Sequence, residues 1–470
     1  MPRQKVVLYN PRAVFHTMPL ALLAVGSTID PERYDVRIID GRLEADPVGR
    51  VVEESRDAVC LGATVLTGAP IRDALLVSRA VKAARPELPV IWGGWHPSLF
   101  PTETLDEPSV DITVQGQGEQ TFVELVDQLA SGKDSAGVAG TSSRVDGKPV
   151  QHPPRALQPM DSFPSANYEL IPVEQYFALK SERQLDYISS TGCHFRCAYC
   201  ADPFVYGRRW VGLSPDRVGE DVEALWRRYH FTDLAFQDET YFTFEKRVVA
   251  VAEEFLRRGV RFTWTATLRA DQADRLGEGV LALCKRSGLR RVMIGVESGS
   301  QEMLDWMSKD IKVEQVIAAA DQCRRYRIGA IFPFIVGFPS ETPESVEATL
   351  RLVKRLRSMS PSFETPIFYY QPYPGSRIAA DVVRAGYRLP QTLDEWAEFD
   401  FVGAWPPWVT PEKHTLVERF KFYNRFAWGP TTWPRRPLQA IARWRCAKDF
   451  YKWPLEKLVV DRLKPLPKLS

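Results

Sequence analysis

Three cysteines within eight residues are the group whose types and spacing point most directly to chemistry. They are Cys193, Cys197 and Cys200, in the spacing C-x3-C-x2-C. Three thiolates can hold three irons of a cubane [4Fe–4S] cluster and leave the fourth iron without a protein ligand. Such an open iron can bind the amino and carboxylate groups of S-adenosylmethionine (SAM) and pass an electron into its sulfonium. We therefore predict that these cysteines are metal ligands at a catalytic centre that makes a 5′-deoxyadenosyl radical.

Two other uses of clustered cysteines fit less well. A structural zinc site needs four ligands, usually as two spaced pairs, and no second pair is present. A disulfide would leave one thiol over and would need an oxidising compartment. The remaining cysteines are scattered in mostly apolar contexts and are predicted to be buried structural thiols: Cys60, Cys284, Cys323 and Cys446.

The region from residue 184 to about 380 resembles the radical SAM superfamily. Its cysteine spacing matches the signature of that superfamily, including an aromatic residue, Tyr199, which in the family lies near the adenine of SAM. Polar or glycine-rich segments recur at later strand ends, where the family places SAM contacts. The resemblance therefore implies further cofactor-binding residues: Gln237, Asp238, Arg269, Glu297, Ser298 and Gly337. Acidic residues at strand ends are also common helix caps, so that alternative stays open.

The elements that would position these residues alternate between strand and helix. Strands are predicted at Leu185–Ser190, Asp233–Gln237, Phe262–Thr267, Arg291–Val296, Ile328–Val336 and Thr365–Tyr370. A helical pattern follows each of the first five. Six β/α units predict a partial (β/α)6 barrel over residues 184–385, with its active face at the C-terminal strand ends. The cysteines follow the first of these strands.

A separate alternation of strands and helices occupies residues 1–140. Buried strands are predicted at Val6–Tyr9, Val36–Ile39, Ala58–Gly62, Val90–Trp92 and Ile112–Val114. This pattern predicts an α/β domain with a Rossmann-like, doubly wound parallel sheet, whose ligands bind outside the C-terminal strand ends. The candidate binding residues at those ends are Asn10, Thr64, Gly93, Gly94, Trp95, His96, Gly116, Gln117, Gly118 and Glu119.

The N-terminal pattern resembles the cobalamin-binding domain found ahead of many radical SAM domains, which implies cobalamin as a further cofactor. Glycines at 93, 94, 116 and 118 would let the backbone approach a flat macrocycle closely. A nucleotide-binding or non-binding flavodoxin-like domain is the alternative. None of the six histidines has Asp two positions before it, so the Asp-x-His-x-x-Gly motif that supplies an axial histidine is absent. The lower cobalt face is then expected to be open to water or blocked by a side chain, with Trp95 or His96 nearby.

The rest of the chain divides into a linker and a C-terminal extension. Residues 141–183 are polar and are predicted to be a linker with a hairpin around Asp146-Gly147. Residues 386–470 form a mainly helical, basic and aromatic extension. Within it, residues 411–470 hold 14 Lys and Arg against five Asp and Glu, with ten aromatic residues. This tail is predicted either to cover the open barrel or to dock at a membrane interface, where Trp and Tyr sit at headgroup level.

Composition limits the cellular setting. The 470 residues are 44% hydrophobic with a net charge of +2, so no global field points to nucleic acid. No apolar run approaches the roughly 20 residues needed to span a bilayer, and the N-terminus lacks a signal-peptide pattern. We expect a cytoplasmic protein, or one peripheral to the inner membrane. An apolar substrate, a lipid, isoprenoid or tetrapyrrole, would suit such a tail.

The combined resemblance implies an enzyme that C-methylates an unactivated carbon by way of methylcobalamin, with a flavodoxin- or ferredoxin-type electron donor. The layout also resembles the anaerobic magnesium-protoporphyrin monomethyl ester cyclase group. Oxidative cyclisation, or another C–C or C–H transformation without methyl transfer, is therefore the alternative. A non-catalytic cobalamin and cluster sensor is the alternative from a different functional class.

Overall fold

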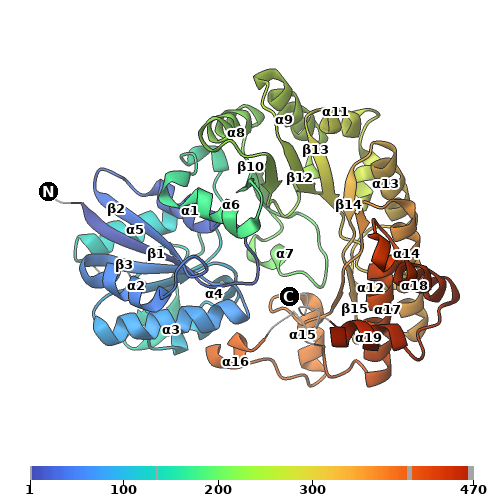
Figure 1. Ribbon diagram of the computed structural model, residues 1–470. Helices are drawn as coiled ribbons and strands as arrows, with labels where there is room; N and C mark the ends of the chain where they lie inside the picture. Colours follow the sequence, from blue (N-terminus) through green and yellow to red (C-terminus); the bar gives the residue numbers. More distant parts are fainter. Residues whose placement is uncertain (1–2, 134–135, 400–404, 464–470) are drawn as a thin grey trace. The chain divides into compact units, whose positions relative to one another are not determined.

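The computed structural model describes residues 3–133, 136–399 and 405–463. The chain forms two compact units (Figure 1). Unit 1 comprises Met1–His194, Ala201–Ala235 and Val383–Asp400, and unit 2 comprises Phe195–Cys200, Phe236–Val382 and Phe401–Ser470. The boundaries predicted at residues 140, 183 and 385 stay predictions.

A seven-stranded sheet organises the N-terminal part of unit 1. Its order is β2-β1-β3-β4-β5-β6-β7. The first five strands are parallel and are β1 (Gln4–Asn10), β2 (Tyr34–Asp40), β3 (Ala58–Thr64), β4 (Val90–Gly93) and β5 (Ile112–Val114). The order reverses between β1 and β3, so the predicted doubly wound topology is confirmed. Loops after β3, β4 and β5 therefore meet at one edge beside this switch point.

The predicted hairpin around Asp146-Gly147 is also confirmed. Strands β6 (Thr141–Val145) and β7 (Lys148–Gln151) are antiparallel and extend the sheet beyond β5. Both turn residues have positive φ, as a two-residue hairpin turn requires. The start of the predicted linker is thus part of the first sheet.

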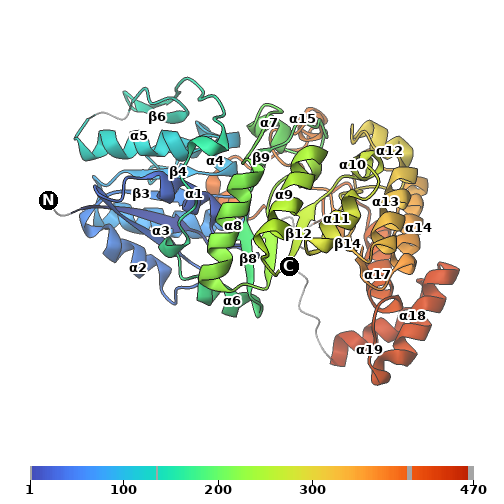
Figure 2. The ribbon, with the colours of Figure 1, turned by 90° about the horizontal axis from the view of Figure 1, so that it is seen from above.

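Helices cover both faces of this sheet. Figure 2 shows α5 (Glu119–Ala130) on one side and α2 (Pro47–Glu54) and α3 (Ala69–Ala84) on the other. Helix α1 (Leu20–Thr28) shares the α5 side, where Leu22, Phe122 and Leu125 pack on the sheet. These faces are apolar because the central strands are runs of Val, Ile and Leu buried on both sides.

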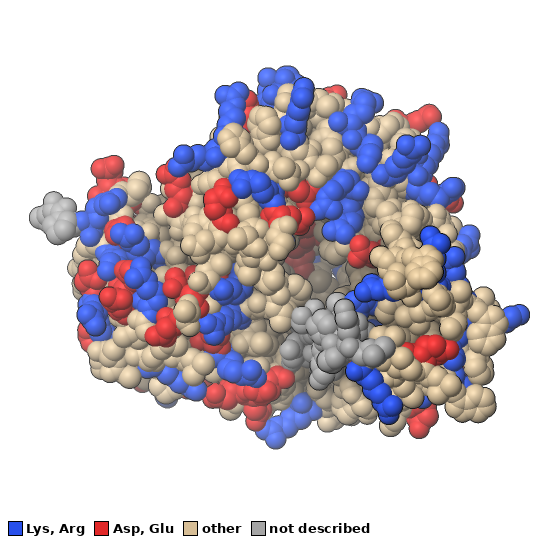
Figure 3. Space-filling model, viewed as in Figure 1, with Lys and Arg blue, Asp and Glu red and all other residues tan. Residues whose placement is uncertain are grey.

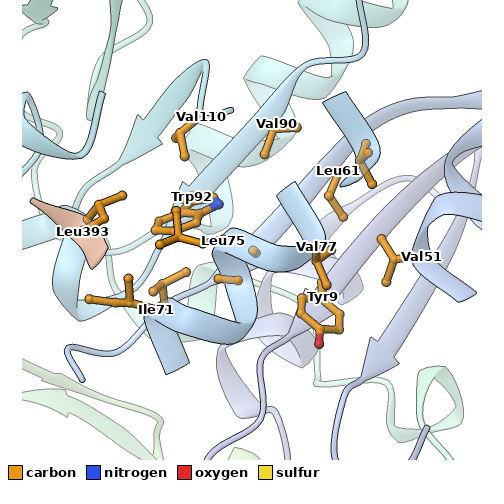
Figure 4. Close-up of a cluster of buried hydrophobic side chains, with 14 of the residues drawn as sticks. Tyr9, Val51, Leu61, Ile71, Leu75, Val77, Val90, Trp92, Val110 and Leu393 are labelled. Carbon is orange, nitrogen blue, oxygen red and sulfur yellow. The ribbon is translucent and has the colours of Figure 1, made fainter. Parts of the chain in front are cut away.

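A late segment of the chain completes the opposite core. Helix α16 (Leu393–Ala397) adds Leu393 and Trp396 to the cluster that contains Trp92 of β4 and Ile71 of α3 (Figure 4). The Trp92 Nε1–H donates to Ser78 Oγ at 2.9 Å, so the largest buried side chain of this core is also satisfied. Residues 393–399, predicted as part of a C-terminal extension, therefore pack on the first sheet.

Unit 1 also holds the first strands of the second alternation. Strands β8 (Gln184–Tyr187) and β11 (Asp233–Phe236) are neighbours, and β9 (Ser190–Gly192) pairs antiparallel with β10 (Trp210–Gly212). The predicted strand Leu185–Ser190 is therefore interrupted. Helices α4 (Trp95–Leu99), α6 (Val173–Lys180), α7 (Asp202–Val205) and α8 (Pro215–Tyr229) belong to the same unit.

Unit 2 continues the alternation with parallel strands. The order β16-β14-β13-β12 joins β12 (Thr263–Thr267), β13 (Leu289–Met293), β14 (Gly329–Ile331) and β16 (Phe363–Glu364). The predicted strands Ile328–Val336 and Thr365–Tyr370 are both wrong in extent. Pro333 and Pro366 lack the N–H that a ladder needs, and the chain resumes as a separate parallel pair, β15 (Phe334–Val336) and β17 (Ile367–Tyr369).

Helices surround these strands. They are α9 (Glu245–Arg258), α10 (Ala270–Arg275), α11 (Val280–Arg286), α12 (Gln301–Trp306), α13 (Val313–Arg325), α14 (Pro343–Met359) and α15 (Arg377–Arg384). Helix α14 starts where Thr342 Oγ1 accepts the Ser345 N–H at 3.2 Å, with a proline at its first position.

The C-terminal region is helical, as predicted. It contains α17 (Pro411–Ala427), α18 (Arg436–Lys448) and α19 (Leu455–Leu463). Asn424 of α17 donates to Thr365 Oγ1 at 3.1 Å, and Lys354 of α14 pairs with Asp449 at 2.6 Å. The region is therefore fastened to the rest of unit 2. No helix among the described residues is both long and apolar enough to cross a bilayer.

Candidate active site

The segment that carries two of the candidate cluster cysteines is held on both sides by backbone hydrogen bonds. The Ala198 N–H donates to the Met307 carbonyl at 2.8 Å, and the Ile378 N–H donates to the Ala198 carbonyl at 3.0 Å. Cys197 is buried, and its Sγ accepts an N–H from Arg269 Nη1 at 3.6 Å. Hydrogen bonds to ligand sulfurs are typical of iron–sulfur clusters, so this contact suits a cysteine that binds iron.

The remaining cysteine, Cys193, belongs to unit 1. It follows Gly192, whose φ of +85° and lack of Cβ let the chain pass the Arg209 carbonyl, which an added Cβ would approach to 2.3 Å. Beside Cys193 lies Asp202, and burial raises the pKa of that carboxyl to about 6. None of these three described cysteines forms a disulfide.

No group of three His, Cys, Asp or Glu side chains in the described parts of the chain could hold a single metal ion. A cubane cluster instead takes each thiolate on a different iron. Thiols outside disulfides and the N–H donor on Cys197 suit that arrangement.

A buried network of three side chains lies next to this segment in unit 2. The Tyr199 hydroxyl donates to Glu297 Oε1 at 2.9 Å, and Lys309 Nζ donates to the Tyr199 oxygen at 2.9 Å and to Glu297 Oε1 at 2.8 Å. Burial lowers the pKa of Lys309, but the Glu297 carboxylate and the Cys197 thiolate outweigh it and raise that pKa, so Lys309 stays charged. Two predicted SAM-site residues, Tyr199 and Glu297, are thus brought together.

The sequence did not indicate that Lys309 belongs to this site. It sits between two residues of positive φ, Ser308 and Asp310, in the loop before α13, and sequence pattern alone reads such a lysine as exposed. Gly295 leaves room for the network, because a Cβ there would lie 2.6 Å from Glu297 Oε1 and 3.0 Å from Lys309 Nζ. The Gly-Val-Glu-Ser-Gly segment was the one sequence feature that indicated a site around Glu297, and it gave no indication of Lys309.

The other predicted SAM-site residues lie at strand ends but differ in what their side chains do. Gln237 is exposed, whereas Asp238 is buried and its carbonyl accepts the Thr267 hydroxyl at 2.9 Å. Ser298 Oγ lies 3.2 Å from Thr349 Oγ1 of α14. It also accepts the Ser300 N–H at 3.1 Å, so its hydroxyl is engaged within the protein.

Gly337 forms a tight turn after β15. Its φ is +81°, its N–H donates to Glu341 Oε2 at 2.6 Å, and its carbonyl accepts the Trp408 Nε1–H at 2.8 Å. An added Cβ would lie 2.7 Å from Val409 Cγ2, so only glycine fits. Burial raises the pKa of Glu341, and one of its carboxylate oxygens has no partner among the described residues.

The two glycine loops of the first sheet are joined by Ser98. Its hydroxyl donates to the Gly94 carbonyl at 2.7 Å and accepts the Gly116 N–H at 2.9 Å. Gly94 has φ +95°, and a Cβ there would meet Thr64 Oγ1 at 2.9 Å. The loop residues predicted for cobalamin, Thr64, Gly93, Gly94 and Gly116, thus lie together at one edge of the sheet.

Two predicted cobalamin-site side chains are engaged by other parts of unit 1. The Asn10 amide donates to Asp40 Oδ2 at 2.9 Å, and Asp40 also accepts the Tyr176 hydroxyl at 2.6 Å. Gln117 is bound to the backbone of Gln158, accepting its N–H at 2.7 Å and donating to its carbonyl at 3.3 Å. Sequence pattern located these loop positions but not their partners.

The remaining N-terminal residues have contrasting surroundings. Trp95 packs edge-on against Tyr206, with ring centroids 6.0 Å apart. His96 is fully buried, with Nδ1 3.1 Å from Thr67 Oγ1 and its ring against Trp396, and burial lowers its pKa to about 3. Gly118 precedes α5, and Glu119 is its first residue, where burial raises the carboxyl pKa.

The C-terminal helices carry an exposed apolar surface. Aromatic residues of α17, including Phe420 and Tyr423, are buried, so the aromatic residues of the predicted extension divide between core and surface. The C-terminal surface consists of the exposed residues Trp433, Trp444, Trp453, Leu455, Leu458 and Val459. Figure 3 shows uncharged areas on the side where α18 and α19 lie, with both basic and acidic side chains among them. The neighbouring exposed cations are Arg435, Arg436, Lys448 and Lys452.

Known protein families match both the N-terminal sheet region and the region that carries the cysteines. The Radical SAM superfamily model matches residues 187–353, and the B12 binding domain model matches residues 5–126. An uncharacterized methyltransferase of Pyrococcus horikoshii is 33% identical over 372 residues, covering 78% of this chain and 79% of that protein. The chain belongs to the B12-binding radical SAM enzymes.

Other relatives of this B12-binding radical SAM enzyme are more distant. The anaerobic magnesium-protoporphyrin IX monomethyl ester cyclase of Rubrivivax gelatinosus is 26% identical over 303 residues, covering 63% of this chain and 54% of that protein. The solved radical SAM methyltransferase TsrM of Kitasatospora setae, with cobalamin and a [4Fe–4S] cluster bound, has a TM-score of 0.67 at 19% identity, covering 83% of this chain and 76% of its own. That likeness confirms the predicted fold class. The cofactors of the family are cobalamin, SAM and the cluster.

Proposed function

We propose that this enzyme transfers a methyl group to an unactivated carbon of a small apolar molecule. The proposal rests on two features of one chain. Cys197 lies in a three-cysteine segment and accepts an N–H from Arg269, and Ser98 joins the two glycine loops of the first sheet. When bound, cobalamin supplies a transferable methyl group, and the cluster supplies the electron that cleaves SAM to a 5′-deoxyadenosyl radical. Cys193, Cys197 and Cys200 are the proposed cluster ligands.

The protein's own residues would bind and orient SAM. Tyr199 and Glu297 are held by Lys309, so neither side chain can rotate without breaking a buried hydrogen bond. A site fixed in this way positions its ligand without paying ordering entropy at the moment of binding. Gly337 would let the backbone approach the adenine side of SAM, since its turn admits no side chain.

Cobalamin is proposed to lie against the loops at Thr64, Gly93–Gly94 and Gly116. The His96 ring is buried in the hydrophobic core, so it does not face a ligand on the surface of these loops. Trp95, the neighbouring large side chain, is partly exposed. If cobalamin binds these loops, His96 would not supply a ligand to it. Nitrogen superhyperfine splitting from a protein ligand in the Co(II) EPR spectrum would contradict that proposal.

Oxidative cyclisation is the second candidate reaction, and the similarity to the Rubrivivax cyclase supports it. The sensor alternative keeps the cofactors but predicts no turnover of SAM. A flavodoxin- or ferredoxin-type protein is the proposed electron donor for either reaction.

The apolar character of the substrate is proposed from the C-terminal surface. Its tryptophans and cations are the residue types that sit at lipid headgroups and on anionic membranes. A lipid, isoprenoid or tetrapyrrole substrate could then be taken from the membrane, with the enzyme peripheral to it.

The test is to follow both SAM products in the reconstituted, reduced enzyme with and without cobalamin. Methyl transfer predicts S-adenosylhomocysteine that requires cobalamin, together with 5′-deoxyadenosine. Formation of 5′-deoxyadenosine alone in the presence of substrate would favour cyclisation. If neither product forms when both cofactors and candidate substrates are present, the sensor alternative is favoured.

A further inference from the structure

The guanidinium of Arg269 is fixed by four partners in unit 2. Its Nε donates to Asp271 Oδ1 at 2.9 Å, its Nη2 donates to the Lys309 carbonyl at 2.7 Å, and its Nη1 donates to Cys197 Sγ at 3.6 Å. The charged group also lies over the Phe195 ring, 3.6 Å from its centroid. Arg269 is buried, so water does not compete for these donors.

This geometry differs from the role that the family resemblance implied for Arg269, a direct SAM contact. The guanidinium is directed at a cysteine sulfur, a carboxylate and a backbone carbonyl of the protein itself. Its N–H donors sit in a rigid planar fork, so turning Arg269 toward another ligand would break several of these contacts together.

We propose that Arg269 is a positioning residue that sets the reduction potential of the cluster through its hydrogen bond to Cys197. The inference rests on the proposed cluster ligation by Cys197. Hydrogen bonds to the ligand sulfurs and nearby positive charge both stabilise the more negative, reduced cluster, which raises its reduction potential. Reduction of the cluster is the step that must precede SAM cleavage, so this residue controls how easily a donor can start the reaction.

The surrounding residues keep this effect local. Asp271 pairs with Arg269 through Nε, not through the nitrogen that donates to the sulfur, and it also pairs with the exposed Arg275 of α10. Lys309, the nearest second cation, is paired with Glu297. Among these cations, Arg269 alone directs an N–H to Cys197.

The chain offers a matched control. Arg275 carries the same charge and pairs with the same carboxylate, but its side chain is 65% exposed. Arg275→Gln therefore removes one positive charge near Asp271 without removing a donor to sulfur. Arg269→Gln removes both the charge and the fixed N–H.

The experiment is an EPR-monitored redox titration of the full chain after anaerobic reconstitution, without SAM. We expect Arg269→Gln to lower the equilibrium constant for cluster reduction about tenfold, or about 59 mV for one electron, with Arg275→Gln matching the wild type. Equal potentials in the wild type and Arg269→Gln would overturn the inference. So would a loss of SAM affinity in Arg269→Gln with the potential unchanged, because that is the signature of a SAM contact.

A second variant covers failure of Arg269→Gln to fold or to load iron. Arg269→Lys keeps the charge but replaces the planar fork by a point charge, so its potential should fall between those of Arg269→Gln and the wild type. A wild-type potential in Arg269→Lys would overturn the hydrogen-bond role. Absence of a cluster in the wild type itself would instead contradict the ligation by Cys197.

Discussion

Lys309 Nζ lies 2.8 Å from Glu297 Oε1, and the two side chains are 7% and 8% exposed. Both also hydrogen-bond to the Tyr199 hydroxyl, which comes from the segment between the candidate cluster cysteines. The ion pair therefore connects the cysteine segment, the segment that follows β13 and the loop before α13. Removing one charge would leave the other buried and unpaired.

We predict that Lys309→Met lowers the free energy of unfolding by about 3–5 kcal/mol, the usual cost of breaking a buried ion pair from one side. Chemical denaturation of the full chain measures this. Lys246→Met on the exposed face of α9 should change stability by less than about 0.5 kcal/mol. The double variant Lys309→Met/Glu297→Gln should recover part of the loss. No recovery would mean that the two side chains are not energetically coupled.

Ser98→Ala should weaken cobalamin binding by about tenfold. The hydroxyl makes two hydrogen bonds that hold Gly94 and Gly116 in place, each contributing roughly 1 kcal/mol. Equilibrium dialysis against cobalamin measures the change. Ser131→Ala removes a similar hydroxyl, bound to Asp127 of α5 on the exposed surface, and should bind cobalamin like the wild type. Unchanged affinity in both variants would separate these loops from the cobalamin site.

His96 should make the stability of the protein depend on pH. Its pKa in the folded chain is about 3, whereas the unfolded chain has about 6.5. The unfolded state therefore binds the extra proton between these values, so the stabilisation is complete above pH 6.5 and is lost as pH falls toward 3. From pH 5.5 to 4.5 the loss approaches about 1.4 kcal/mol.

Chemical denaturation at several pH values tests this prediction. His96→Asn should remove that part of the pH dependence, whereas His230→Asn, at an exposed helix end, should keep it. An identical pH profile for His96→Asn and the wild type would show that another group is responsible.

The C-terminal surface should bind anionic membranes. Trp433 and Trp453 are 78% and 75% exposed, and inserting them in the interface would bury apolar area at about 25 cal/mol per Å². We expect Trp433→Ser/Trp453→Ser to reduce co-sedimentation with vesicles of mixed anionic and zwitterionic lipid at least tenfold. Phe244→Ser removes an exposed aromatic residue elsewhere in unit 2 and serves as the control. Equal binding of all three proteins would contradict the membrane proposal.

Secondary structure was predicted well where neighbouring residues in the sequence determine it. The strands of the first sheet were found within two residues of their ends because they are apolar runs bounded by turns, and Asp146-Gly147 marked its hairpin. Pro333 and Pro366 broke two predicted strands, although proline was a visible warning. The packing of α16 on α3 could not be predicted, because nothing near Leu393 indicates that the chain returns to the first sheet.

Side-chain partners were the least predictable feature of the site. The sequence placed Arg269 and Glu297 at strand ends, but it held no sign that Lys309 would neutralise Glu297. Asn10 was a sound loop prediction, yet its amide is taken by Asp40, a residue 30 positions later. Such contacts depend on strand order and register, which join residues that are far apart in the chain.

Cluster ligation by the three cysteines is tested by comparing Cys197→Ala with Cys323→Ala after identical anaerobic reconstitution. Iron and sulfide content and 5′-deoxyadenosine formation from SAM are measured in the reduced proteins. We expect that Cys323→Ala, which alters a buried thiol of α13, keeps the cluster and makes 5′-deoxyadenosine, whereas Cys197→Ala makes none. Equal 5′-deoxyadenosine formation by the two variants would contradict a cluster held by Cys193, Cys197 and Cys200.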